Sequence, residues 1–157
     1  MNTIKKQHLK KFAKETEELF HNRVYAILWI GIILIPLFAI LDFVVAREHF
    51  RLFLIYRLLC SLCFIILLFL NHHKLGRGYP FEIAITAFIL AGFTISMMIV
   101  KMGGYGSFYY AGIVLVLVAY STILPLSASQ ARISGLILFI VFTMPILLAG
   151  APSFDTL

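Results

Sequence analysis

Five apolar stretches separated by short polar links dominate the hydrophobic pattern of the chain. They cover roughly residues 24–46, 50–70, 81–100, 108–126 and 133–149. A helix needs about 17–25 predominantly apolar residues to cross a hydrocarbon core of about 30 Å. Each stretch has about this length, and the last is the shortest. The pattern therefore predicts an all-α, polytopic transmembrane helix bundle with five spans in this chain.

The segment before the first stretch, residues 1–22, has apolar positions every three or four residues, and lysines occupy other faces of the predicted helix. We expect a basic amphipathic helix that lies on the cytoplasmic surface of the membrane. A solvated leader is the alternative. The chain is thus expected to have two parts, the leader helix (1–22) and the transmembrane bundle (23–157).

Prolines and links predict how the bundle is arranged. Three stretches contain a proline, which we expect to bend the helices: Pro36, Pro125 and Pro145. The links between the stretches are short, which favours antiparallel neighbours. They cover residues 46–49, 71–80, 101–107 and 127–132.

The composition supports a membrane protein. Hydrophobic residues make up 62% and charged residues 13% of the 157 residues, whereas a soluble domain is near half apolar and about a quarter charged. The net charge is +6. The bases gather in the leader and in the links, a pattern typical of contact with anionic lipid head groups and not with nucleic acid.

The sequence contains no nucleophile–base pair, phosphate-binding glycine loop or carboxylate pair. We therefore expect no catalytic residue and no enzyme activity in this chain. Cys60 and Cys63 have the spacing of a zinc half-site, but the second ligand pair is missing from the sequence. We interpret both cysteines as packing residues and expect no metal site.

The distribution of bases predicts the orientation. With the N-terminus in the cytoplasm, nine Lys and Arg residues lie inside and three, Arg47, Arg51 and Lys101, lie outside, which satisfies the positive-inside rule. We expect a multi-pass protein of the cell inner membrane. Five spans would then leave the last residue outside, so we expect a truncated six-helix bundle whose sixth helix would return to the cytoplasm.

Two charged residues, Asp42 and Arg57, fall inside apolar stretches, where an unpaired charge is costly. Antiparallel helices would place them at similar depth, so we expect an ion pair. It is interpreted either as a clamp between two helices or as one wall of a polar pocket. The tyrosines at this level would line that pocket or anchor the helices at the membrane interface; they are Tyr56, Tyr105, Tyr109 and Tyr110.

Three histidines map to the cytoplasmic ends of the helices: His21, His72 and His73. Histidines on neighbouring helices can act as the axial ligands of a membrane haem. Because His72 and His73 lie beside a lysine in a link, hydrated histidines are the alternative.

Several short motifs give the chain a family resemblance. The first stretch carries Ile35, Pro36, Leu37 and Phe38 followed by Asp42, and the second carries Tyr56, Arg57 and Leu58. The fourth contains Tyr109 to Ile113 and ends at Ile123 to Leu126. From about residue 23 to 149, the arrangement resembles the six-helix N-terminal membrane domains of bacterial signalling proteins. Such domains precede class III adenylate cyclases, histidine kinases and diguanylate cyclases.

This resemblance implies a membrane-embedded sensor or regulatory domain of a signalling enzyme, without catalysis of its own. It also implies a homodimer and a cytoplasmic output domain outside this chain. The signal would be a small molecule or a cofactor, with haem as one candidate. The alternatives are a passive membrane anchor or assembly subunit, a haem-binding membrane sensor, and a fragment of a small transporter.

Overall fold

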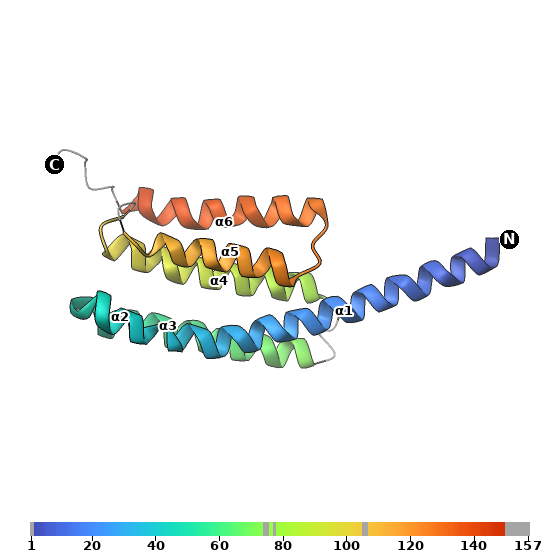
Figure 1. Cartoon of the computed structure of the whole chain (residues 1–157), viewed down its shortest axis with the longest axis horizontal. Coiled ribbons are helices and arrows are strands. Elements are labelled where there is room, and N and C mark those ends of the chain that lie inside the picture. Colours follow the sequence, from blue (N-terminus) through green and yellow to red (C-terminus); the bar gives the residue numbers. More distant parts are fainter. Residues whose placement is uncertain (1, 74–75, 77, 105–106, 150–157) are drawn as a thin grey trace.

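The computed structural model describes residues 2–73, 76, 78–104 and 107–149, with only the backbone described for residues 2–14 and 17. Every regular element in this part of the chain is a helix, which confirms the all-α prediction. Figure 1 shows α1 and α2 beside α3, with α4, α5 and α6 stacked against them. The elements are α1 (Asn2–Leu37), α2 (Ala39–Val45), the short 3-10 helix η1 (Arg47–His49), α3 (Phe50–His72), α4 (Pro80–Lys101), α5 (Tyr110–Ile123) and α6 (Ala128–Leu148).

The leader and the first apolar stretch form one continuous helix, α1. Its 36 residues correspond to a length of about 54 Å at the usual helical rise, well above a hydrocarbon core of about 30 Å. Figure 1 shows its N-terminal part extending beyond the bundle. Whether this part lies on a membrane surface stays a prediction.

The first stretch is interrupted at Phe38, two residues after Pro36, and continues as α2. Proline has no backbone N–H to donate, and its ring crowds the preceding turn of a helix. Two backbone bonds carry the chain through the break, from Phe38 N–H to the Leu34 carbonyl at 3.1 Å and from Asp42 N–H to the Phe38 carbonyl at 3.2 Å. The break separates Asp42 from the regular helix that precedes it.

The fourth stretch is shorter as a helix than the sequence predicts. Instead of spanning residues 108–126, α5 has 14 residues, or about 21 Å. Leu124 is extended, with φ −90° and ψ 133°, because a residue before proline avoids the helical conformation. The Leu126 N–H then donates to the Leu124 carbonyl at 2.9 Å, which closes a tight turn around Pro125. Pro125 therefore ends a helix and does not bend one.

The fifth stretch is longer as a helix than predicted, because α6 begins at Ala128, inside the expected link 127–132. Ser127 accepts a hydrogen bond from the Gln130 N–H at 3.3 Å, and the Gln130 side chain accepts one from the Ser127 N–H at 3.0 Å. This capping box satisfies two backbone donors that would otherwise lack partners. With 21 residues, α6 is not the shortest of the five predicted spans; the fourth is, because α5 has only 14 residues and is not among the segments long enough to cross a membrane.

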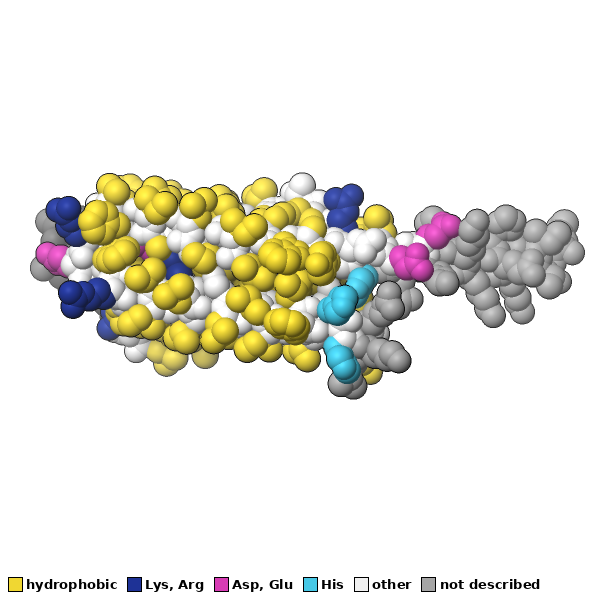
Figure 2. Space-filling model, turned by 90° about the horizontal axis from the view of Figure 1, so that it is seen from below, with side chains coloured by type: hydrophobic (Ala, Val, Ile, Leu, Met, Phe, Trp, Pro, Cys, Tyr) yellow, Lys and Arg dark blue, Asp and Glu magenta, His cyan; other side chains and the backbone are white. Residues whose placement is uncertain are grey.

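Four segments are long and apolar enough to cross a membrane: Glu18–Val45, Arg47–His72, Pro80–Lys101 and Ala128–Leu148. Large hydrophobic side chains are exposed along them; Ile33, Phe69 and Leu148, for example, have 62%, 72% and 80% of their surface accessible. Figure 2 shows these side chains covering one face of the bundle between basic groups at its ends. Since soluble monomers rarely expose such continuous apolar surface, length, composition and surface all indicate a multi-pass membrane protein.

The centre of the bundle is α4, which packs against α1, α3, α5 and α6. Its buried side is rich in small residues, including Ala84, Ala87, Ala91 and Gly92, and small residues let membrane helices approach closely. By contrast, α5 has few contacts with α1 and α6 and is held mainly by α4. One side of α5 is therefore left open toward α1.

We expect Gly92→Val to destabilise the bundle and Gly135→Val to act as its matched control. A Cβ added at Gly92 would lie 2.7 Å from Cδ1 of Leu138 on α6, whereas one added at Gly135 would meet nothing within 4 Å. Overpacking typically costs about 1–3 kcal/mol. Unfolding by sodium dodecyl sulfate in mixed micelles would measure the difference between the variants. Equal shifts would contradict the close packing of α4 and α6.

Candidate functional site

The candidate site is centred on Asp42 in α2 and Arg57 in α3, which the turn through Ala46 and η1 places side by side. Asp42 has no accessible surface and Arg57 has 8%. Side chains on a helix tilt toward its N-terminus. The Arg57 side chain therefore tilts toward the turn and that of Asp42 away from it, so that the two meet at one depth.

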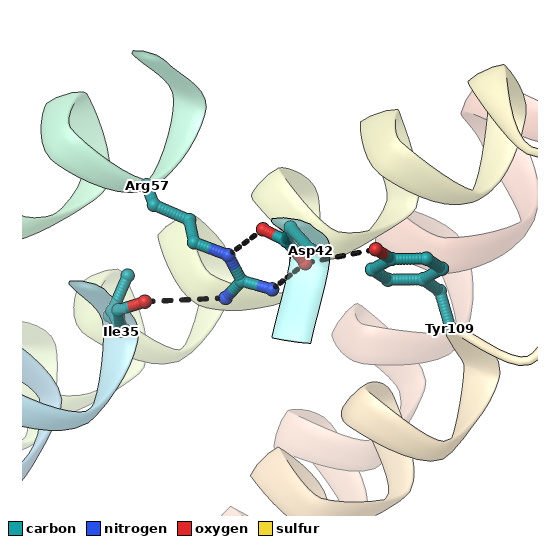
Figure 3. Close-up of polar contacts among 4 residues, drawn as sticks. All are labelled: Ile35, Asp42, Arg57 and Tyr109. Carbon is teal, nitrogen blue, oxygen red and sulfur yellow. Dashed lines mark hydrogen bonds and ion pairs between the residues drawn. The ribbon is translucent and has the colours of Figure 1, made fainter. Parts of the chain in front are cut away.

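The two side chains form a bidentate ion pair. The Arg57 Nε–H donates to Asp42 Oδ2, and Nη2 donates to Oδ1 at 2.8 Å. Nη1 also makes a long hydrogen bond of 3.4 Å to the carbonyl of Ile35, just before the break in α1. The ring of Phe38 lies 5.7 Å from the guanidinium carbon, within the range of a cation–π contact. Figure 3 shows Arg57 between Ile35 and Asp42.

Tyr109 connects this pair to the start of α5. Its hydroxyl donates to Asp42 Oδ1 at 2.9 Å, as Figure 3 shows. Its backbone N–H donates to the Ser107 hydroxyl at 3.2 Å, and its ring packs edge-on against Phe53 of α3 with centroids 5.6 Å apart. The cluster of Asp42, Arg57 and Tyr109 thus joins three segments that are distant in the sequence.

A groove of about 390 Å³ runs from this cluster along the open side of α5. One wall is formed by α1 and α2, from Ile27 to Val45, a distance of about 27 Å along the helices. The other wall is α5, and α3 and α4 form the floor. The volume lies in the range of small-molecule sites. The groove is apolar apart from a few groups: Asp42, Arg57, Cys60, Thr94, Tyr109 and Tyr120.

The tyrosines predicted at the level of the ion pair differ in their positions in the structure. Tyr109 contacts Asp42, but Tyr56 and Tyr110 do not line the groove. Tyr56 is half-buried and packs near Phe53. Tyr110 is 55% exposed, as expected of an interface anchor. Tyr105 lies outside the described residues.

The candidate haem ligands lie away from the groove. His72 and His73 are exposed at the C-terminal end of α3, and His21 is half-buried on α1. None of the three lines the groove. The haem hypothesis relies on two facing histidines as axial ligands, and the groove gives it no support.

Sequence reasoning missed several groups of the site. The Ile35 carbonyl carries no signal in a sequence, although its position directly before Pro36 marks a place where a helix is easily interrupted. Cys60 is buried and lines the groove, whereas Cys63 is half-buried and does not. Tyr120 also lines the groove, stacked on Phe88 with centroids 4.1 Å apart. Inside an apolar stretch, Tyr120 is indistinguishable from a membrane-facing residue.

Fold and surface place the chain in the class of multi-pass membrane helix bundles, here with a buried ion pair at the end of an apolar groove. Comparisons with protein-family models, curated proteins and solved structures find no match for it. The function must therefore be inferred from the geometry of the site.

The ion pair predicts a specific pattern of stability. Asp42→Leu or Arg57→Met alone leaves one buried charge without its partner, which costs about 3–5 kcal/mol. The double variant removes both charges, and replacing a buried pair by apolar residues is often neutral. We expect it to recover most of the loss, measured by unfolding in mixed micelles. Single variants as stable as the native chain would contradict a buried pair.

Proposed function

We propose that the chain is a membrane-embedded regulatory domain that binds a small signal in the groove beside the Asp42–Arg57 pair. The observation that carries this proposal is the hydrogen bond from Tyr109 to Asp42. It makes the packing of α5, the weakly held wall of the groove, depend on the same carboxylate that joins α2 to α3. A molecule that competes for these groups would change how α5 packs.

A purely structural clamp between α2 and α3 needs neither the hydrogen bond from Tyr109 nor the groove. The two hydrogen bonds of the bidentate pair between Asp42 and Arg57 already join α2 to α3. An anchor gains nothing from a groove of about 390 Å³ beside that pair, because an open groove forfeits packing contacts. A polar cluster at the end of an otherwise apolar groove is instead the usual composition of a ligand site.

In this proposal, the chain has no catalysis of its own. Binding favours one of two packings of the helices, and the bias passes to a cytoplasmic output domain outside this chain. By the family resemblance, the output is an adenylate cyclase, a histidine kinase or a diguanylate cyclase that works as a homodimer. The domain lies in the inner membrane with its N-terminus in the cytoplasm. A passive anchor is the competing function that the experiments must exclude.

The orientation is tested with fusions at two links. A fluorescent protein fused after Gly78 should fluoresce, because the bases of the leader and of this link favour the cytoplasm. Alkaline phosphatase fused after Ala46 should be active, because the turn at η1 would lie outside. The exchanged fusions serve as controls. The reverse pattern would contradict a cytoplasmic N-terminus.

Regulation is tested with a dimer-dependent adenylate cyclase domain joined after Leu157 through one added hydrophobic helix, which returns the chain to the cytoplasm, and expressed in cyclase-deficient cells. Tyr109→Phe removes the bond to Asp42, and we expect it to change cyclic AMP production by about fivefold or more, the scale of typical allosteric coupling. Tyr110→Phe is the matched control, because Tyr110 is exposed and outside the groove. It should leave production unchanged.

The Asp42→Leu/Arg57→Met double variant provides a second test, because it keeps the bundle folded but removes the polar cluster. It should shift cyclic AMP production in the same direction as Tyr109→Phe. Production equal to that of the native chain in both variants, at equal membrane abundance, would identify a passive anchor.

A further inference from the structure

The unused hydrogen-bonding capacity of the polar cluster indicates what the groove binds. A guanidinium has five N–H donors, and Arg57 uses three in its bonds to Asp42 and to the Ile35 carbonyl. Two donors remain on a side chain that is only 8% exposed and lines the groove. The hydroxyl of Tyr109 donates to Asp42, and its oxygen can still accept a hydrogen bond. The cluster therefore offers both donors and an acceptor to a ligand.

The charge of the cluster restricts that ligand. Asp42 and Arg57 neutralise one another at close range, and Asp42 has no accessible surface. An anionic head group at Arg57 would be repelled by the carboxylate behind it, and a cationic one by the guanidinium. Either would enter an apolar site without a counter-charge, which is costly. A neutral polar group such as a hydroxyl or a carbonyl meets neither penalty.

The shape of the groove restricts the rest of the ligand. From Asp42 to Ile27, the groove extends for 15 residues of α2 and α1, which is about 22 Å of helix. The walls along this length are almost entirely apolar. Asp42 itself lies four residues before Ala46, the residue that caps α2, so a bound head group would lie about 6 Å below this end of the helix. A bulky, strongly hydrated head group does not suit that depth.

From these observations we infer that the groove binds a neutral single-chain amphiphile, which enters from the bilayer. Its hydroxyl or carbonyl oxygen accepts a hydrogen bond from Arg57, and its hydrocarbon chain lies between α1 and α5. This inference rests on the proposed function and adds the chemical class of the signal. The open side of α5 provides a lateral entrance, because α5 contacts α1 only sparsely.

The test uses the full chain in nanodiscs and three probes with the same chain: oleyl alcohol, oleate and oleylamine. A photoactivatable oleyl alcohol is crosslinked to the protein, and mass spectrometry locates the labelled peptides. We expect saturable labelling of α1 and α5 and non-saturable labelling of α6, which contributes no residue to the groove. Oleyl alcohol should compete about tenfold better than oleate or oleylamine, because either charged head group would enter the apolar groove without a counter-charge.

The double variant Asp42→Leu/Arg57→Met should still be labelled on α1 and α5, but oleyl alcohol should bind it about tenfold more weakly than the native chain, because the hydrogen bond from Arg57 is lost. Equal competition by the three probes in the native chain would overturn the inference, as would stronger competition by oleate or by oleylamine. Non-saturable labelling of α1 and α5 would also overturn it, because the groove would then hold only bulk lipid.

The cyclase reporter separates this inference from the proposed function. A reporter that responds to Tyr109→Phe, combined with no head-group preference, overturns the ligand class and leaves the regulatory function standing. Preferential binding of oleyl alcohol, combined with an unresponsive reporter, supports the ligand class and overturns the regulatory function.

Discussion

The fold depends on one requirement: a buried carboxylate on the first span and a buried guanidinium on the second must find each other. Neither charge is tolerated alone in an apolar bundle, because desolvation costs several kcal/mol per ion. Together, in a bidentate arrangement, they satisfy most of their hydrogen-bonding capacity. The pair fixes the rotation of α2 and α3 about their axes and their relative depth. Hydrophobic side chains that face lipid or one another specify neither of these closely.

The interrupted first span makes this pair possible. Pro36 ends the regular helix near Phe38, and α2 then carries Asp42 to the level of Arg57. The same interruption brings the Ile35 carbonyl within reach of Arg57, at 3.4 Å. In a membrane, a carbonyl near a helix break needs a partner from a neighbouring helix, and Arg57 supplies it. A single side chain thus neutralises a carboxylate and supports a backbone discontinuity.

This arrangement has consequences for motion. Packed helices change state in discrete steps and do not deform continuously. Here α4 is the fixed centre, with contacts to four other helices, whereas α5 is short and weakly held. The Tyr109 hydroxyl attaches α5 to the ion pair. The way in which α5 packs therefore depends on this one hydrogen bond. Because α1 runs without a break from the groove wall through the leader, a shift of that wall would move the leader as one body.

The sequence was a good guide wherever hydrophobic length or an isolated charge decides the outcome. The helical class and the extents of α3 and α4 follow from runs of apolar residues. The meeting of Asp42 and Arg57 follows from the cost of an unpaired charge. It was a poor guide where local backbone chemistry overrides hydropathy, because residues 108–126 are mostly apolar up to Leu126 although Pro125 ends the helix. The capping box of Ser127 and Gln130 has a recognisable spacing, but these polar residues lie outside the apolar stretch that hydropathy defines.

The tyrosines show a different limit. Tyr56, Tyr109 and Tyr110 all lie near the N-terminal ends of their stretches, and nothing in their spacing singles out Tyr109. Tyr109 is the tyrosine that reaches Asp42 because of the rotation of α5 on α4 and because of the turn before α5. In that turn, the Tyr109 N–H donates to the Ser107 hydroxyl at 3.2 Å. Such tertiary positions cannot be obtained from one helix at a time.

The strength of the ion pair also explains why the cluster suits recognition better than chemistry. A lone arginine in this groove would attract any anion, and a lone aspartate any cation, so neither would discriminate among the charged lipids that surround it. By neutralising one another, Asp42 and Arg57 leave only directional N–H groups and one phenolic oxygen facing an apolar channel. In the proposed site, a neutral head group would then be recognised by the geometry of its hydrogen bonds, and a charged one would be excluded because it finds no counter-charge.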